Sequence, residues 1–265
     1  MPVDKPTGIS LIRSGTQMKP VLIVQNCPAE SAGTIIDYLS SRELPYQEIH
    51  SYTGDRFPRV EDCSAVICLG CPTSVNDYHD HRYLADLYSF VAQVVRADVP
   101  YLGVCYGGQL LAKVLGASVK ANHVKEIGVY KVRLTEAGKT DPLLAPLGNS
   151  FPVMQWHGDT FGRPYGCELL AEGTDCTNQA FRHGRQVALQ FHLEATESLV
   201  HSWCEAYPQE PADVEKTVPE LLREFRSVAD TVKQLNFVFL DSYFTGVKEN
   251  QFNNHTLQAR PNRSR

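Results

Sequence analysis

Short apolar runs alternate with amphipathic stretches along the first half of the chain. The apolar runs are bounded by polar residues, Gly or Pro and are typical of strands, most of them buried: Val21–Gln25, Tyr46–His50, Ala65–Leu69 and Tyr101–Val104. Between them, apolar residues at helical spacing predict helices over 30–42, through 84–95 after a cap at Asn76-Asp77, and over 107–115. Strands that alternate with helices indicate βαβ units and a parallel sheet covered on both faces.

After Gly116 the pattern becomes richer in strands. Alternation around Tyr130–Leu134 predicts a half-exposed strand, and the runs on either side of His183-Gly184 predict a hairpin. From about 212 to Leu235, apolar residues again recur at helical spacing, and Pro219 is expected to start the helix proper rather than to break it. This helix either docks on its own domain or offers a dimer or partner surface. The expected fold is a three-layer α/β/α domain with a central mixed, mostly parallel sheet.

Length and composition narrow the class of protein. The chain has 265 residues and a net charge of −5, which argues against a broad nucleic-acid surface. No apolar run approaches the roughly 20 residues that span a bilayer, and the N-terminus lacks the apolar core of a secretory signal. We therefore predict a soluble cytoplasmic protein with reduced thiols and no membrane partner. The C-x-x-C formed by Cys68 and Cys71 has no second pair at zinc-site spacing.

The strongest chemical signal is Gly103-Val104-Cys105-Tyr106-Gly107, where a predicted strand meets a predicted helix. This has the logic of the nucleophile elbow G-x-S-x-G, with sulfur in place of oxygen. Small flanking residues permit a strained turn, and the helix N-terminus favours a thiolate. The composition predicts only about 0.04 matches by chance. Cys105 is therefore the predicted nucleophile.

A thiol nucleophile needs a base, and the base needs an orienting group. Two His-x-acid pairs are candidates, His157-Gly158-Asp159 and His192-Leu193-Glu194. His192 ends a predicted strand, so it projects from a sheet edge as Cys105 does, and Glu194 leaves on the same side. His157 lies in a glycine-containing segment that suits substrate contacts better. We predict Cys105, His192 and Glu194 as the catalytic set.

Three ordered segments resemble class I (triad) glutamine amidotransferases, and among these the amidotransferase domain of GMP synthase. They are Gly103–Ala112, Met154–Asp159 and Gln190–Glu194. The resemblance spans about residues 19–205 and implies a flavodoxin-like fold without a metal or organic cofactor. It divides the chain into a flexible leader (1–18), an amidotransferase domain (19–205), a C-terminal helical extension (206–246) and a loose tail (247–265).

The resemblance implies hydrolysis of the glutamine side-chain amide through a γ-glutamyl thioester. The oxyanion would be held by the backbone N–H of Tyr106 and by one from the Gly70-Cys71-Pro72 turn. Glutamine's α-amino and α-carboxylate groups would lie near Gln109 and near the loop that contains Gln155, Trp156, His157 and Asp159. The family usually has Gly-Gly-Pro at the oxyanion turn, and a cysteine tolerates positive φ poorly compared with glycine. Cys71 could therefore impair this turn, or form an inhibitory disulfide with Cys105.

Three functions remain open at this point. The first is a stand-alone amidotransferase that supplies ammonia to an unidentified acceptor, with a synthetase partner in trans, because the chain contains no ATP-pyrophosphatase loop and no G-x-x-x-x-G-K-[ST] loop. The second is a γ-glutamyl peptide hydrolase with the same triad. The third is a non-catalytic binding protein on this fold. A homodimer is compatible with all three.

Overall fold

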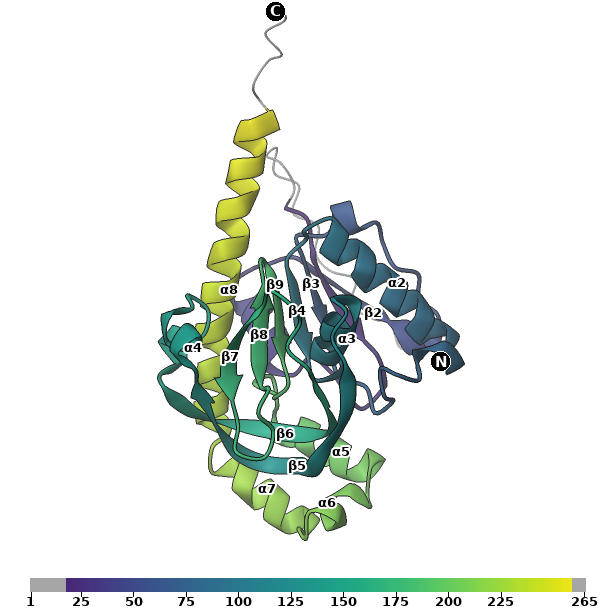
Figure 1. Cartoon of the computed structure of the whole chain (residues 1–265), viewed down its shortest axis with the longest axis vertical. Helices are drawn as coiled ribbons and strands as arrows, with labels where there is room; N and C mark the ends of the chain where they lie inside the picture. Colours follow the sequence, from purple (N-terminus) through teal and green to yellow (C-terminus); the bar gives the residue numbers. More distant parts are fainter. Residues whose placement is uncertain (1–17, 259–265) are drawn as a thin grey trace, which may run out of the picture.

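The computed structural model describes residues 18–258, with side chains as far as Val247. Its centre is a nine-stranded sheet in the order β2-β1-β3-β4-β9-β8-β7-β5-β6 (Figure 1). The strands are β1 (Val21–Gln25), β2 (Tyr46–His50), β3 (Ala65–Cys68), β4 (Tyr101–Val104), β5 (Val119–Leu134), β6 (Ser150–Phe161), β7 (Glu168–Glu172), β8 (Ala180–His183) and β9 (Gln186–Leu189). The helices are α1 (Thr34–Ser41), α2 (Arg82–Arg96), α3 (Tyr106–Val114), α4 (Glu136–Thr140), α5 (Glu197–Ala206), α6 (Glu210–Asp213), α7 (Val218–Arg226) and α8 (Ala229–Gln258).

The sheet has a parallel half and an antiparallel half. Strands β2, β1, β3, β4 and β9 pair in parallel, as the alternation of strands and helices predicted. Strands β8, β7, β5 and β6 continue the sheet in antiparallel pairs, and the predicted hairpin joins β8 to β9, with His183 opposite Gln186. The long strands β5 and β6 cross below the rest of the sheet in Figure 1. The sheet is therefore mixed, and the predicted α/β class is confirmed.

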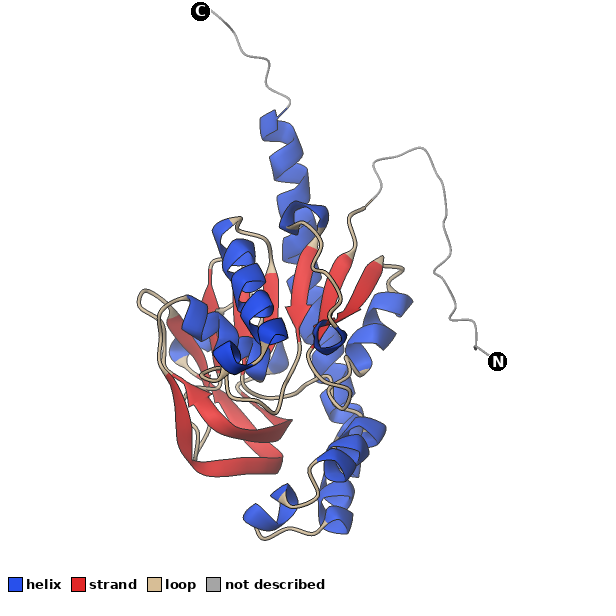
Figure 2. Ribbon diagram, turned by 90° about the vertical axis from the view of Figure 1, so that its right-hand side faces the viewer, coloured by secondary structure: helices blue, strands red, loops and turns tan. Residues whose placement is uncertain are grey.

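Helices cover both faces of the sheet, which gives it three layers (Figure 2). Alternate residues of the parallel strands enter two separate cores, because successive side chains of a strand point to opposite faces. Val21 and Ile23 join the core under α1, α5, α7 and α8, whereas Leu22 and Val24 join the core under α2 and α3. Full burial on both faces explains why these strands read as continuous apolar runs.

The C-terminal segment forms more helices than the sequence pattern predicted. In place of one helix through 212–235, the chain forms α6, α7 and the start of α8, separated by turns at 214–217 and 227–228. Thr217 caps α7 through a capping box, and Pro219 lies in the first turn, so the proline begins this helix as expected. Leu221, Phe225 and Val232 are buried in the core under α1. These helices thus dock on their own domain.

Two further segments differ from expectation. The α2 helix begins at Arg82 after a short 3₁₀ turn at Tyr78–Asp80, so Asn76-Asp77 does not cap it. Helix α8 continues to Gln258 through residues expected to form a loose tail, because 247–258 contain no Gly or Pro to end it.

The leader at 1–17 and residues 259–265 lie outside the described residues, and the division into domain and extension stays a prediction. Within residues 18–258, every helix is too short or too polar to span a lipid bilayer.

The turn from β4 into α3 packs directly against the neighbouring strand β3. A Cβ atom at Gly107 would lie 2.1 Å from the backbone oxygen of Cys68, and one at Gly103 would lie 2.3 Å from the oxygen of Gly107. Real Cβ atoms do not approach backbone this closely. Glycine at these positions therefore lets α3 begin against the sheet.

We predict that Gly107→Ala destabilises the protein by at least about 1–3 kcal/mol, because backbone atoms of β3 must move to admit the methyl group. Urea unfolding monitored by circular dichroism measures this change. Gly246→Ala is the matched control, since nothing lies within 4 Å of its added Cβ in α8, and alanine is the better helix former. Equal stability of the two variants would contradict the packing described here.

Candidate active site

Cys105 lies in the turn between β4 and α3, the strand–turn–helix context that the motif predicted. Its backbone has φ 51° and ψ −107°, a conformation that costs a non-glycine residue on the order of 1–3 kcal/mol. Helix α3 begins at Tyr106, so the free N–H groups of its first turn lie beside the thiol. The strain and the helix terminus together match the requirements of a nucleophile elbow.

The thiol of Cys105 is enclosed. Only 7% of the residue is exposed, and its Sγ donates to the backbone oxygen of Trp156 at 3.7 Å. The side-chain amide of Gln190 donates to the same sulfur at 3.8 Å. Burial raises the pKa of Cys105, and hydrogen bonding and charge from His192 oppose this rise. A thiolate here therefore depends on His192.

His192 and Glu194 reach the elbow because β9 is the direct neighbour of β4, with Leu189 opposite Val104. The Nδ1 atom of His192 lies 2.5 Å from Oε1 of Glu194, and both side chains are buried. Burial by itself lowers the pKa of His192, but the charge of Glu194 and contacts with both Glu194 and Cys105 outweigh it, so the pKa is well above its usual value. Nε2 of His192 has no hydrogen-bond partner of ordinary geometry among the described residues. The ring is therefore oriented by Glu194, with its second nitrogen available to the thiol.

The Gly70-Cys71-Pro72 turn follows β3, the strand on the other side of β4. Neither Gly70 nor Cys71 has a positive φ, so the expected strain at Cys71 is absent. All eight cysteines are free. Burial raises the pKa of the Cys71 thiol, which hydrogen-bonds with Thr73 and Tyr83. The cysteine is thus accommodated in this turn without a disulfide to Cys105.

Three of the predicted substrate-binding residues surround the elbow. Gln109 on α3 donates to the backbone oxygen of Asp159 at 3.0 Å and to Oε1 of Gln190 at 3.3 Å. The carboxylate of Asp159 accepts a hydrogen bond from Ser74 at 2.7 Å. Trp156, whose backbone oxygen contacts the thiol, donates from its indole to a carboxylate of α6. The structure brings these residues to the nucleophile.

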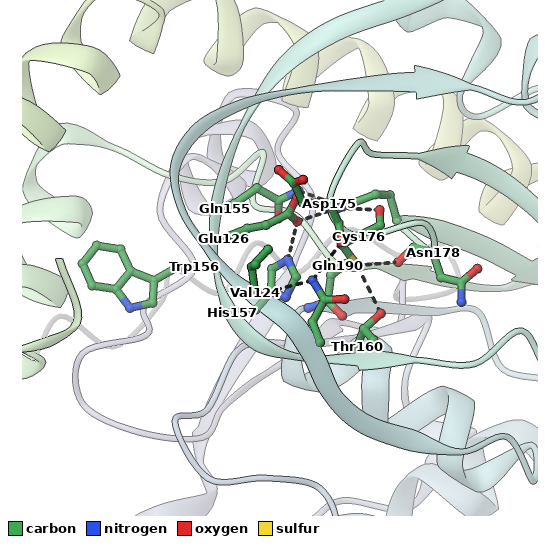
Figure 3. Close-up of polar contacts among 12 residues, drawn as sticks. Val124, Glu126, Gln155, Trp156, His157, Thr160, Asp175, Cys176, Asn178 and Gln190 are labelled. Carbon is green, nitrogen blue, oxygen red and sulfur yellow. Dashed lines mark hydrogen bonds and ion pairs between the residues drawn. The ribbon is translucent and has the colours of Figure 1, made fainter. Parts of the chain in front are cut away.

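Gln155 and His157 lie in a different environment. In Figure 3 the Trp156 side chain points away from these two neighbours, as alternation along β6 requires. The amide of Gln155 donates to Gln179 at 2.8 Å, and the ring of His157 contacts Glu126 at 2.8 Å. These two predicted substrate contacts therefore face a buried polar cluster rather than the thiol.

The buried cluster contains a second Cys-His-Glu set. Glu126, His157 and Cys176 place their ligand atoms within 4.8 Å of one another, which makes them candidate metal ligands (Figure 3). Every member already has protein partners: His157 contacts Glu126 and the oxygen of Asp159, Gln179 donates to Glu126, and Cys176 contacts Thr160 at 3.1 Å. This hydrogen-bonded set joins β5 and β6 to the β7–β8 loop.

The second set also differs from Cys105 in its surroundings. Cys176 lies in the loop before β8, with no helix N-terminus beside it. Burial, partly offset by hydrogen bonds, raises the pKa of its thiol to about 11. Both nitrogens of the His157 ring are engaged, so neither is available to accept a proton from that thiol. The geometry therefore favours Cys105, rather than Cys176, as the nucleophile.

Sequence reasoning missed a group of residues that adjoin the elbow. Glu30 follows β1 and lies against Gly70. The ring of Trp203 in α5 lies 4.7 Å from the ring of His192, tilted by 57°. Tyr207 and Glu210 come from the segment after α5. None belongs to a short motif. Only the adjacency of the ends of β1 and β3 in the sheet could have indicated Glu30.

Comparison with known proteins agrees with this geometry. Residues 27–202 match the family glutamine amidotransferase class-I. The chain is 32% identical over 209 residues to the glutamine amidotransferase-like protein YfeJ of Salmonella typhimurium, covering 76% of this chain and 84% of that protein. It is 31% identical over 204 residues to the glutamine-hydrolysing GMP synthase of Rhodopseudomonas palustris, covering 71% of this chain but only 36% of the synthase.

Solved structures agree with both comparisons. A glutamine amidotransferase from Thermotoga maritima superposes with a TM-score of 0.78 at 27% identity, covering 84% of this chain and 97% of that one. One from Methylobacillus flagellatus gives a TM-score of 0.79 at 28% identity, covering 87% and 96%. The chain contains an elbow cysteine and a buried His–Glu pair, and its fold is shared with these structures. The family match covers most of the chain. This protein therefore belongs to the class I glutamine amidotransferase family.

Proposed function

We propose that this protein hydrolyses the side-chain amide of glutamine through Cys105, His192 and Glu194. The observation that carries the proposal is the meeting of two elements at one sheet edge: a strained elbow cysteine at the N-terminus of α3, and a buried imidazole held 2.5 Å from a carboxylate after the adjacent strand. Nucleophile, base and orienting group are the three parts that acyl transfer through a thiol requires.

The first half of the reaction forms the thioester. His192 takes the proton of Cys105, and the resulting thiolate attacks the γ-carbonyl carbon of glutamine. Charge that develops on the carbonyl oxygen is stabilised by the N–H groups of Tyr106 and of the turn at Gly70-Cys71. The imidazolium then protonates the departing nitrogen, and ammonia leaves. Glu194 stabilises the imidazolium during both proton transfers.

The second half releases glutamate. Water attacks the γ-glutamyl thioester while His192 accepts its proton, and the thiol is restored. Gln109, Trp156 and Asp159 are joined by hydrogen bonds around the elbow, and we assign them to contacts with the rest of the substrate. Gln155 and His157, on the opposite face of β6 from Trp156, hold this part of the strand in place through the buried cluster around Glu126.

The two catalytic functions that remain open differ in the product that leaves the γ-carbonyl group and in where it goes. GMP synthases are glutamine-hydrolysing proteins that this chain matches over about a third of their length. We propose a separate synthetase as the acceptor partner. The alternative is a γ-glutamyl peptide hydrolase, in which the same triad releases an amine rather than ammonia. Measured preference between glutamine and γ-glutamyl dipeptides separates the two.

We predict that Cys105→Ala lowers the rate of glutamate release from glutamine by about 10⁴-fold or more, since no other group can form the thioester. A coupled glutamate assay measures the rate, and mass spectrometry after treatment with a glutamine-like diazoketone locates the modified residue. Wild-type protein should carry one modification, at Cys105.

Cys63→Ala is the matched control, because Cys63 is buried to the same degree, at 6% exposed against 7% for Cys105, and lies away from the elbow. It should keep wild-type activity and labelling. Modification at Cys176 instead of Cys105 would overturn the assignment of the nucleophile. Absence of turnover on glutamine and on γ-glutamyl dipeptides, with no labelling, would favour a binding protein.

We predict that Glu194→Gln lowers kcat by about 10²- to 10⁴-fold, because the amide cannot stabilise the imidazolium. The pKa of His192 is raised chiefly by Glu194 against the effect of burial, so the substitution should lower it. Since His192 must be unprotonated to take the proton of Cys105, its pKa defines the low-pH limb of kcat/KM, and that limb should move to lower pH. The pH dependence of kcat/KM checks this.

Glu205→Gln provides the control for this experiment. Glu205 also pairs with a histidine, His201, but at 3.7 Å on an exposed face of α5. Its substitution should change neither kcat nor the pH profile. A profile for Glu194→Gln that keeps the wild-type low-pH limb would show that Glu194 does not set the protonation of His192.

A further inference from the structure

Gln190 is a fully buried glutamine beside the nucleophile. It directly follows β9, which pairs with β4 so that Leu189 lies opposite Val104. The backbone N–H of Cys105 donates to the backbone oxygen of Leu189 at 2.8 Å. Because this bond joins the elbow to the residue before Gln190, the position of the glutamine is fixed relative to the sulfur.

Hydrogen bonds determine which end of the Gln190 amide faces the sulfur. The side-chain amide of Gln109 contacts the backbone oxygen of Asp159 at 3.0 Å, and a backbone oxygen can only accept, so the atom of Gln109 at this contact is Nε2. The same nitrogen lies 3.3 Å from Gln190, which must therefore present its oxygen there. The amide nitrogen of Gln190 is then the atom that faces Cys105, with Nε2 at 3.8 Å from Sγ.

The sulfur of Cys105 lies between a hydrogen-bond acceptor and a hydrogen-bond donor. The backbone oxygen of Trp156, 3.7 Å away, accepts the proton of the neutral thiol. It disfavours a thiolate, since a carbonyl oxygen carries partial negative charge. The N–H of Gln190 can bond to either form of sulfur and bonds more strongly to the anion. Of these two contacts, only the one with Gln190 favours the charged form.

Ionisable groups around the thiol act on its charge in both directions. Burial raises the pKa of Cys105, His192 opposes this rise through a hydrogen bond and its charge, and the charges of Glu30 and Glu194 add to it. Gln190 differs from these side chains because its amide does not titrate. Its N–H therefore stabilises a thiolate at every pH, whether or not His192 carries the proton.

We propose that Gln190 is a catalytic residue whose amide N–H stabilises negative charge on the sulfur of Cys105, and that Gln109 is the positioning residue that directs this amide. The inference rests on the proposed function, because it assigns roles within the same reaction. It adds a neutral hydrogen-bond donor to the three ionisable side chains that cleave the amide.

The sulfur carries negative charge at two points of the reaction. In the first half, it becomes negative when His192 takes its proton, and neutral when its bond to the γ-carbonyl carbon forms. In the second half, that bond breaks, the electron pair returns to sulfur, and His192 returns the proton. The N–H of Gln190 stabilises the sulfur at both points without gaining or losing a proton.

The test is the pH dependence of Cys105 alkylation in Gln190→Met, which keeps a side chain of similar length but removes the N–H donor. Wild-type protein and variant are treated with iodoacetamide over a range of pH, and mass spectrometry follows the peptide that contains Cys105. The midpoint of the rate should move to higher pH by about one unit, because the thiolate has lost a donor. At neutral pH, kcat/KM for glutamine should fall by about 10- to 10²-fold. An unchanged midpoint would overturn the proposal.

Gln186→Met is the matched control. Gln186 is the first residue of β9 and is 1% exposed, and its amide also donates to protein oxygens, at Asp98 and Val99. It lies at the other end of the strand from the thiol, so its substitution should leave the midpoint and kcat/KM at their wild-type values. Equal shifts of the midpoint in the two variants would show that loss of a buried glutamine, rather than of the N–H beside sulfur, is responsible.

Gln109→Met tests the positioning role and does not require Gln190→Met to fold. It removes the donor that holds the oxygen of Gln190, so the amide can turn away from the sulfur. The alkylation midpoint should again move to higher pH, by a smaller amount than in Gln190→Met. Iodoacetamide lacks the α-amino and α-carboxylate groups of glutamine, so this shift is independent of substrate binding. A wild-type midpoint would reject the positioning role.

Two outcomes separate this inference from the proposed function. A shifted midpoint in Gln190→Met, with no glutamate release by the wild-type protein from glutamine or from γ-glutamyl dipeptides, would reject the proposed function and retain the stabilisation of sulfur. Glutamate release by the wild-type protein, with an unchanged midpoint in Gln190→Met, would reject only the role of Gln190.

Discussion

The close contact between the β4–α3 turn and strand β3 is the constraint on which the site depends. Because Gly107 has no side chain, the first turn of α3 reaches the backbone of Cys68, and Cys105 is held at φ 51° directly above the sheet. Two consequences follow from this contact. The first turn of α3 lies against the end of β3 beside Cys105, and the strain at Cys105 is maintained by packing rather than by local preference.

The structure contains two sets of cysteine, histidine and glutamate, and the two sets differ in how completely their side chains are hydrogen-bonded. Glu126, His157 and Cys176 satisfy one another and their neighbours, so this set behaves as a rigid support for β6. In the other set, Glu194 engages only one nitrogen of His192 and leaves the second available. A hydrogen-bond network in which every group has a partner stabilises the structure around it. A network with one free nitrogen can accept and donate a proton.

The segment after the amidotransferase motifs completes the enclosure of the site. Trp203 of α5 packs on the ring of His192, the hydroxyl of Tyr207 contacts the thiol of Cys27 at 3.5 Å, and the indole of Trp156 donates to Glu210 at 2.5 Å. In Figure 1, α5, α6 and α7 lie beneath β5 and β6, at the same end of the molecule. These contacts exclude water from Cys105 and Glu30, and the lower effective dielectric raises the pKa values of both.

The sequence alone determined the strands of the parallel half, the hairpin at His183-Gly184 and the elbow at Cys105, because each is encoded within a few neighbouring residues as an apolar run or a turn. The candidate set of Cys105, His192 and Glu194 was also predictable, since two strand ends carry it. Tertiary structure alone decided that Gln155 and His157 face Glu126 and that Glu30 adjoins Gly70. Those outcomes depend on which residues distant in sequence fill the same space, and no local pattern records that.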